Sequence, residues 1–277
     1  MRLFLRFLVL ALGIFAIAAG ILAGTALAGK KVPRSGFYVF KDARMGASIE
    51  YRNRRGKLIW RENATDSGGA STGDACTDSR HTLIGARWDV WPTYFVNTSS
   101  VPAEIDPGAA LTDIDAGQNA WESPFVTDCS FVPGITDYQA FDGGTTTAGP
   151  SLAFDVTFDG LNTVAFVPLS ETICAGPGMI ACTVAWSERG RFVEADMAIE
   201  SDLTVLGGDF RWTTGDTTSV ADGAGQFALI DVATHEFGHF AGLGHVKNSP
   251  ELTMFPALRD GWQTLGLGDM KGLLARY

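Results

Sequence analysis

The sequence has few basic residues and very few histidines. Its 277 residues include 21 lysines and arginines against 31 aspartates and glutamates, which gives a net charge of −10. This acidic balance argues against a nucleic-acid partner, because such partners are bound by surfaces rich in positive charge. Three of the four histidines fall between positions 235 and 245. This concentration of a scarce residue marks that stretch as the candidate functional site.

Cysteine is equally scarce, and its spacing does not resemble a metal-binding cluster. An even number of cysteines is typical of an exported protein with two disulfides. The sequence permits three pairings of Cys76, Cys129, Cys174 and Cys182. The short separation of Cys174 and Cys182 favours a loop closed between them, which leaves Cys76 to pair with Cys129.

A long apolar run occurs at the amino terminus. Phe7 to Ala23 is apolar throughout, follows Arg2 and Arg6, and precedes the small residues of Ala26–Ala28. This pattern predicts an export signal over residues 1–28, and it places the mature protein outside the cytoplasm, either secreted or periplasmic. The run is also long enough for an uncleaved membrane anchor, which is the alternative. In that case the remainder would face outward from a membrane.

The composition changes along the chain and suggests a division into parts. Residues 29–79 begin with basic side chains and become rich in Gly, Ser, Thr and Asp after Asn63, which is typical of an extension and a linker. Two short strands are expected there, at 37–40 and 57–60, and the segment could be a pro-segment. Residues 80–277 are expected to form the main domain.

Within the main domain, the patterns predict strands followed by helices without regular alternation. Such an order favours an α+β fold over a doubly wound parallel sheet. The expected strands are 88–96, 151–158, 162–168, 183–186 and 191–200, and the expected helices are 107–121 and 226–242. The polar loop 202–225 carries Asp209, Asp216 and Asp222, which could bind Ca²⁺, although solvated turns have the same composition.

The histidine-rich stretch has the spacing H-E-x-x-H-x-x-G-x-x-H. On a helix, His235 and His239 project from the same face and can meet one metal ion. Gly242 can adopt a left-handed turn that returns the chain and brings His245 to the same ion. Three imidazoles with an open fourth position are typical of a catalytic zinc site. Glu236 lies beside the first ligand, where its carboxylate can act as a general base on a metal-bound water.

This stretch resembles the zinc motif of the metzincin metallopeptidases. Met254, followed by Pro256, is similar to the Met-turn of the matrixin branch, and residues 268–277 are similar to the closing matrixin helix. Residues 159–166 and 193–199 are similar to strands of secreted bacterial matrixin-like peptidases. The resemblance implies a twisted mixed sheet packed with the active-site helix and a carboxy-terminal helix. It also implies that Met254 packs beneath the zinc ligands without touching the metal.

Two departures from the matrixins affect what can be expected. The sequence has no Pro-Arg-Cys-Gly latency segment, and Cys76 lies in Asp-Ala-Cys-Thr, so inhibition by a cysteine is not expected. Animal matrixins bind a second, structural zinc largely through histidines. Here only His81 lies outside the motif, so one Zn²⁺ is expected.

The combined hypothesis is a secreted zinc-dependent endopeptidase, with zinc held by His235, His239 and His245 and with Glu236 as the general base. By resemblance, a protein or peptide substrate binds in extended form beside an edge strand at about 193–200. The alternative is a non-catalytic zinc-binding surface or binding protein on a peptidase-like scaffold.

Overall fold

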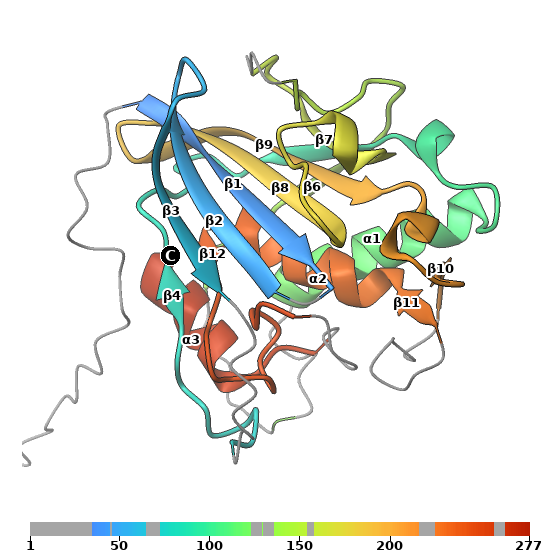
Figure 1. Ribbon diagram of the computed structural model, residues 1–277. Coiled ribbons are helices and arrows are strands. Elements are labelled where there is room, and N and C mark those ends of the chain that lie inside the picture. Colours follow the sequence, from blue (N-terminus) through green and yellow to red (C-terminus); the bar gives the residue numbers. More distant parts are fainter. Residues whose placement is uncertain are drawn as a thin grey trace, which may run out of the picture.

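The computed structural model (Figure 1) describes residues 35–44, 46–64, 73–122, 129, 136–153, 158–215, 225–257 and 264–277. Several sequence-based predictions fall at least partly outside these residues. They include the export signal at 1–28, the extension and linker at 29–79, the middle of the strand expected at 151–158, and the part of the acidic loop that holds Asp216 and Asp222.

The described residues form one large mixed sheet with the strand order β3-β2-β1-β8-β9-β7-β5-β6. From β9 to β6 the neighbouring strands are parallel, and from β9 to β3 they are antiparallel. The bounds are β1 Ser35–Ala43, β2 Gly46–Asn53, β3 Leu58–Ala64, β5 Thr93–Val96, β6 Phe141–Thr145, β7 Asn162–Val167, β8 Met179–Glu188 and β9 Arg191–Glu200.

Two helices, α1 (Pro107–Glu122) and α2 (Leu229–Phe240), pack together against one face of this sheet (Figure 1). The indole of Trp121 donates a hydrogen bond of 2.7 Å to the carbonyl of Thr234, which ties α1 to α2. Gly117 allows the close approach, since a Cβ there would lie 2.8 Å from the Thr234 nitrogen. The helix that carries the histidine motif is therefore fixed between α1 and the sheet.

Smaller elements complete the described structure. The third helix, α3, spans Leu267–Arg276, and short 3-10 helices occupy Thr98–Ser100, Leu169–Glu171 and Leu203–Leu206. Strand β4 (Thr82–Leu83) pairs with β12 (Leu243–Gly244), and β10 (Arg211–Thr213) pairs with β11 (Gln226–Ala228). Within the described ranges, no helix is long and apolar enough to cross a membrane.

Strand β1 is buried on both faces, although it precedes the segment expected to form the main domain. Phe37 and Val39 belong to a core on one face of the sheet, and Tyr38 and Phe40 belong to the larger core beneath α1 and α2. Because side chains alternate along a strand, Asp42 faces the same side as Tyr38 and Phe40. The amino-terminal strands thus join the main sheet and present an acidic residue toward α2.

Several sequence-based predictions are confirmed. The mixed α+β class is observed, the helix expected at 107–121 is α1, the strand at 162–168 is β7, and the hairpin through 188–190 joins β8 to β9. The expected strands at 37–40 and 57–60 lie within or overlap β1 and β3. Both predicted disulfides, Cys76–Cys129 and Cys174–Cys182, are present.

Three predictions need correction. The strand expected at 88–96 is confined to Thr93–Val96, and the helix expected from 226 begins at Leu229 because 226–228 pair with β10. The proposed edge strand at 193–200 is wrong, since β9 is paired on both sides, by β8 and by β7. Strand β8 lies between β9 and β1 and pairs with both.

Glu194 and Asp196 of β9 are buried carboxyl groups, and we expect their ionisation to destabilise the fold as the pH rises. Burial, followed by the charge of Asp196, raises the pKa of Glu194 from 4.5 to about 8, and burial raises the pKa of Asp196 from 3.8 to about 7. Both pKa values are higher in the folded chain than in the unfolded chain, so the folded chain holds protons that the unfolded chain releases. The contribution of these two groups to the free energy of unfolding is therefore fully present below their pKa values in the unfolded chain. It is lost as the pH rises through their pKa values in the folded chain. Each group can contribute up to about 1.4 kcal/mol per pH unit in that window.

We therefore expect the melting temperature to fall between about pH 5 and about pH 9, and Glu194→Gln to make that fall smaller. Thermal unfolding followed by circular dichroism across this range measures the effect. The exposed Glu171→Gln is the control and should follow the parent chain. Identical pH dependence of Glu194→Gln and the parent would contradict the assignment.

Candidate metal centre

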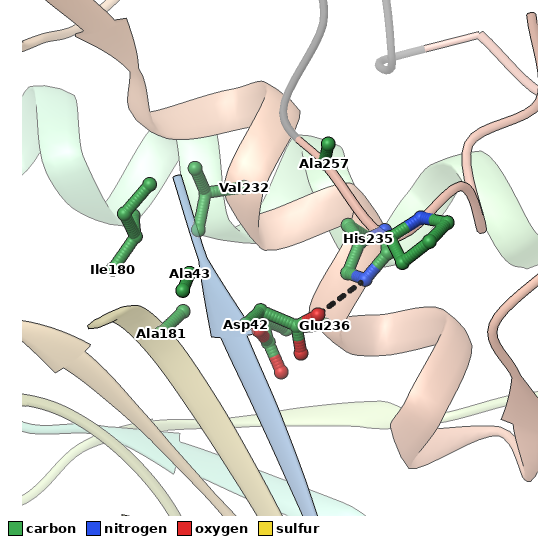
Figure 2. A pocket seen from close by; sticks show the side chains of 9 residues that line it. Asp42, Ala43, Ile180, Ala181, Val232, His235, Glu236 and Ala257 are labelled. Carbon is green, nitrogen blue, oxygen red and sulfur yellow. Dashed lines mark ion pairs between the residues drawn. The ribbon is translucent and has the colours of Figure 1, made fainter. Parts of the chain in front are cut away.

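Helix α2 carries the first two histidines of the motif and the glutamate between them. Figure 2 shows His235 and Glu236 on α2 together with Asp42 at the end of β1. The Nδ1 atoms of His235 and His239 lie 2.6 Å and 2.9 Å from the carbonyl oxygens of Thr253 and Leu243. A carbonyl only accepts hydrogen bonds, so each Nδ1 carries the proton and each Nε2 keeps its lone pair. This tautomer is the one required for a metal ligand bound through Nε2.

The turn after α2 brings the third histidine back to the first two. Gly242 has a φ of 96°, a left-handed value that favours glycine, and its N–H donates to the carbonyl of His239 at 2.9 Å. The chain then pairs with β4 as β12 and places His245 so that its Nε2 lies 3.1 Å from Nε2 of His239. The structure thus brings together the three histidines that the spacing predicted, by the turn that was expected.

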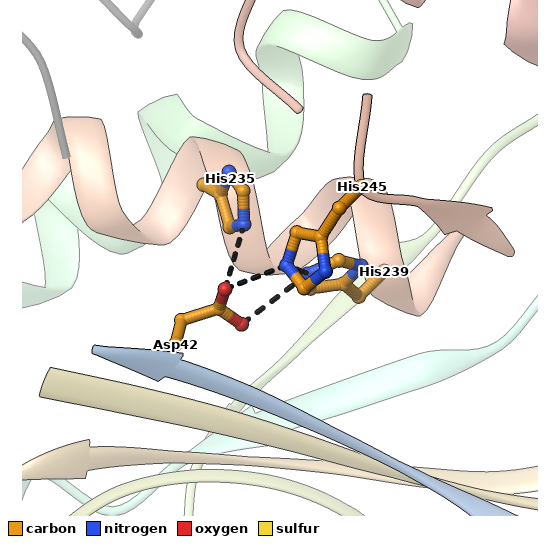
Figure 3. A group of neighbouring side chains, drawn as sticks. All are labelled: Asp42, His235, His239 and His245. Atoms are coloured by element: carbon orange, nitrogen blue, oxygen red, sulfur yellow. Dashed lines mark hydrogen bonds and ion pairs between the residues drawn. The ribbon is translucent and has the colours of Figure 1, made fainter. Parts of the chain in front are cut away.

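A fourth group, Asp42, lies among the three imidazoles (Figure 3). Its Oδ1 is 2.6 Å from Nε2 of His245 and 3.3 Å from Nε2 of His235, and its Oδ2 is 3.3 Å from Nε2 of His239. The four ligand atoms lie within 4.8 Å of one another. Sequence reasoning missed Asp42. The available signal was an aspartate on the same face of a strand as Tyr38 and Phe40, a position where an unpaired charge is costly.

The donor set fits a metal cation. Burial, and then the neighbouring His245, lower the pKa of His239 from 6.5 to about 4, so this imidazole is neutral near pH 7. The Nε2 atoms of His239 and His245 lie 3.1 Å apart, close enough for one cation to contact both. Three imidazole nitrogens and a carboxylate oxygen are ligands that zinc accepts in a tetrahedral arrangement. The cluster can therefore hold a metal ion, and its chemistry suits Zn²⁺.

Glu236 lies next to this cluster but is not one of its four members. Its side chain is fully buried, and its Oε2 accepts a hydrogen bond from the hydroxyl of Thr183 on β8. Burial, and then the charge of Asp42, raise the pKa of Glu236 well above its usual value. Thr183 thus holds one oxygen in place, and a hydrogen bond with Asp42 contributes to the raised pKa of Glu236.

A cavity adjoins the cluster on the side of Glu236 (Figure 2). Its volume is about 280 Å³, including space open to solvent. Apart from Asp42, His235 and Glu236, the lining is apolar and consists of Ala43, Ile180, Ala181, Val232, Pro256 and Ala257. A group bound in this cavity would therefore meet the metal cluster at one end and an apolar wall along most of the remainder.

The loop after His245 packs against α2 through Met254. Met254 is fully buried, and a Cβ on Gly238 would lie 2.2 Å from its sulfur, so the helix and the methionine are in close contact. Asp269 of α3 accepts hydrogen bonds from the backbone N–H groups of Thr253 at 3.0 Å and Met254 at 3.2 Å. The carbonyl of the same Thr253 accepts from Nδ1 of His235, so α3 indirectly orients a metal-facing ring.

The fourth histidine lies elsewhere. His81 contacts the carbonyl of Ser79 at 3.1 Å and does not belong to the cluster. Within the part of the chain that the structure describes, no second group of three or more His, Cys, Asp or Glu side chains is arranged to hold a metal. The suggested calcium site in the loop 202–225 falls partly outside this part, and it stays a hypothesis.

Comparisons with known proteins add no assignment. The sequence matches no protein-family model, and no curated protein matches it. The function must therefore be argued from the site itself.

Proposed function

We propose that this chain is a zinc-dependent endopeptidase of the metzincin type. The observation that carries the proposal is the convergence of three Nε2 atoms beside a carboxylate that is not a ligand, Glu236, at the end of a cavity. The spacing of the motif, Met254 beneath α2 and α3 after the Met-turn support the resemblance to the matrixin branch. Binding of a metal by the histidines alone would not require Glu236 at this position.

The residues present can perform the steps of peptide hydrolysis. His235, His239 and His245 would hold zinc, which when bound polarises a carbonyl and lowers the pKa of a water ligand toward ~7. With the charge of Asp42 withdrawn and a cation bound nearby, Glu236 would be ionised, would take a proton from the attacking water and would pass it to the nitrogen of the leaving amine. Thr183 fixes one Glu236 oxygen, so the other is directed to the proton.

An extended substrate would lie along β8, in the place that β1 takes in the described structure. This strand carries Thr183, which touches Glu236, and Ala181, which lines the cavity, so a peptide paired with β8 passes the metal cluster. Pairing with a strand supplies backbone hydrogen bonds whatever the side chains are. The apolar lining by Ile180, Val232 and Ala257 favours an apolar side chain of the substrate in the cavity.

The site of action would be outside the cytoplasm. Two disulfides are typical of oxidising compartments. The amino-terminal export pattern predicts the same destination, with a membrane anchor as the alternative.

One observation favours the second candidate, a non-catalytic zinc-binding protein. Asp42 would complete a set of four protein ligands, and a closed set of four is typical of structural zinc sites. Against this, a purely structural site has no use for a buried carboxyl group, Glu236, that lies beside the four ligands without being one of them. The two candidates differ in one measurable property, which is hydrolysis.

We expect the Asp42→Ala chain, loaded with zinc, to cleave a long unstructured peptide at internal bonds. A chelator should stop the cleavage, and added Zn²⁺ should restore it. Mass spectrometry of the products at early times identifies the bonds. Loss of terminal residues alone would indicate an exopeptidase. Intact peptide in the presence of zinc-loaded protein, also after the pairing of β1 with β8 has been weakened by a second substitution, would favour the non-catalytic candidate.

A further inference from the structure

The amino-terminal meander, defined as β1–β3 (residues 35–64), reaches both the metal cluster and the strand proposed to bind substrate. We propose that Asp42 is the fourth ligand of the metal and that β1 occupies the substrate position along β8, so that the meander keeps the site closed. The second part of this inference rests on the proposed function, because it takes the molecule that β1 keeps away from β8 to be a peptide substrate. The ligand assignment itself requires only that the cluster binds a metal.

The position of Asp42 is that of a ligand and not of a distant counter-charge. Both carboxylate oxygens point into the space between the rings (Figure 3), at 2.6 Å from His245 and 3.3 Å from His235 and His239. The side chain is 14% exposed, so most of its hydration has been removed. A carboxylate is buried at this cost when it is paired with cations or bound to a metal. With three imidazoles it makes a set of four, which leaves no position for a reactive water.

The backbone of β1 occupies the β8 edge. The two strands are antiparallel, with residues 35 to 42 of β1 opposite 188 to 181 of β8, and Asp42 lies opposite Ala181. The ring of Phe40, two residues earlier, stacks on His239 with 4.3 Å between ring centroids. A strand edge can pair with one partner at a time, so a substrate and β1 compete for β8.

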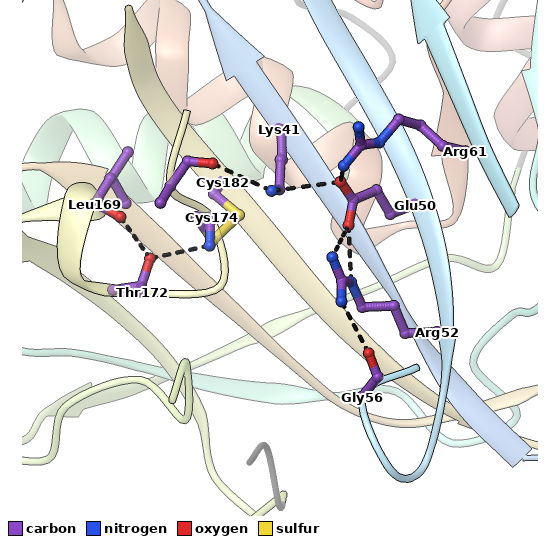
Figure 4. A network of polar contacts seen from close by, with 10 residues as sticks. Lys41, Glu50, Arg52, Gly56, Arg61, Leu169, Thr172, Cys174 and Cys182 are labelled. Carbon is purple, nitrogen blue, oxygen red and sulfur yellow. Dashed lines mark hydrogen bonds and ion pairs between the residues drawn. A yellow bond between two sulfur atoms is a disulfide. The ribbon is translucent and has the colours of Figure 1, made fainter. Parts of the chain in front are cut away.

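The meander carries the partners of its own buried charge. Glu50 on β2 is fully buried and forms ion pairs with Lys41, Arg52 and Arg61, all within residues 35–64 (Figure 4). Separation of the meander from β8 would therefore not leave Glu50 without its cations. Lys41 also donates to the carbonyl of Ala175 across the boundary, at 3.3 Å.

The consequence is that β1 must leave β8 before a peptide can bind, and that Asp42 must leave the metal before water can bind there. A chain arranged as observed would bind zinc and remain inactive. Loss of Asp42 alone should open the metal to small ligands. Loss of strand pairing is needed in addition for a peptide to bind at full rate.

The test uses Co²⁺ as a spectroscopic probe in the full-length chain, with acetohydroxamic acid as a small ligand for an open metal position. In the parent chain, the visible absorption of Co²⁺ should not change on addition of acetohydroxamic acid. In Asp42→Ala the absorption should differ at once and should shift on titration, with binding at least roughly 10-fold tighter than in the parent. Asp89→Ala, which removes an exposed aspartate paired with Arg191, is the matched control and should behave like the parent.

A second variant separates the two parts of the proposal. Tyr38→Pro, added to Asp42→Ala, removes the backbone donor that faces Ala185 of β8 and weakens the pairing of β1 with β8. Peptide cleavage should rise at least roughly 10-fold from Asp42→Ala to the double variant. Circular dichroism and Co²⁺ stoichiometry show that the chain remains folded.

Each outcome has a defined meaning. If the parent binds acetohydroxamic acid as tightly as Asp42→Ala does, Asp42 is not a ligand and the proposal fails, whatever the cleavage rates are. If the single and double variants cleave equally fast, β1 does not exclude substrate, and that part fails. If Asp42→Ala opens the metal but neither variant cleaves any peptide, the ligand assignment stands and the proposed peptidase function is what fails.

Discussion

Replacing Glu236 with glutamine should lower kcat/KM for peptide cleavage by at least ~10²-fold, the usual contribution of a general base. Metal content should stay at about one ion per chain, because Glu236 is not among the four clustered ligands. Glutamine has nearly the same size, and its amide oxygen can still accept from Thr183. What it cannot do is take a proton from water.

The variant is best compared in the Asp42→Ala background, where the metal position is expected to be open. Glu171→Gln is the matched control, because Glu171 is exposed and lies outside the metal cluster, the cavity and the meander. Cleavage rates and metal content are measured on the same samples. A Glu236→Gln chain that keeps most of its activity would show that another group accepts the proton.

Replacing His245 with alanine should remove the metal from the parent chain, and it should remove both metal and peptide cleavage in the Asp42→Ala background. Removal of a group that only orients a ligand typically lowers metal affinity ~10–100-fold. Removal of a ligand itself has a larger effect, so we expect zinc affinity to fall at least ~100-fold. The remaining His235 and His239 offer two nitrogens on one helix face, and Asp42 alone does not compensate for the missing ring.

His81→Ala is the matched control for this prediction, because it removes the histidine that lies outside the cluster. Competition with a chromogenic zinc chelator gives the affinities of both variants. If His245→Ala binds zinc as tightly as the parent, the three-histidine site is wrong.

The parts of the site that local spacing determines could be predicted from the sequence. His235 and His239 are one helical turn apart, and Gly242 takes the left-handed conformation that the return of His245 needs. The pairing of Cys174 with Cys182 was predicted from their short separation in the sequence. The helix at 107–121 was predicted from apolar residues that recur at helical spacing.

The contribution of Asp42 could not be predicted in this way. It lies 203 positions before His245 in the sequence, and it reaches the cluster only because β1 pairs with β8. Strand pairing between distant segments depends on tertiary packing and has no local signature. For the same reason, β9 was mistaken for an edge strand, since its own sequence does not reveal that β8 covers it.

The helix boundary at Leu229 shows a related limit. Phe227 and Ile230 fit a helical stripe, so the helix was expected to start at 226. Residues 226–228 instead pair in parallel with β10, where Trp212 and Phe227 are both buried. Tertiary pairing thus overrides a periodicity that is correct for the remainder of α2.

The central claim is that the three histidines and Asp42 bind one metal ion, because both the proposed hydrolysis and the proposed closure depend on it. Native mass spectrometry of the full-length chain, after incubation with Zn²⁺ and exhaustive desalting, tests this most directly. We predict a mass increase equivalent to one zinc per chain, retained by His81→Ala and lost by His245→Ala. A parent chain that emerges from desalting without metal would contradict the claim.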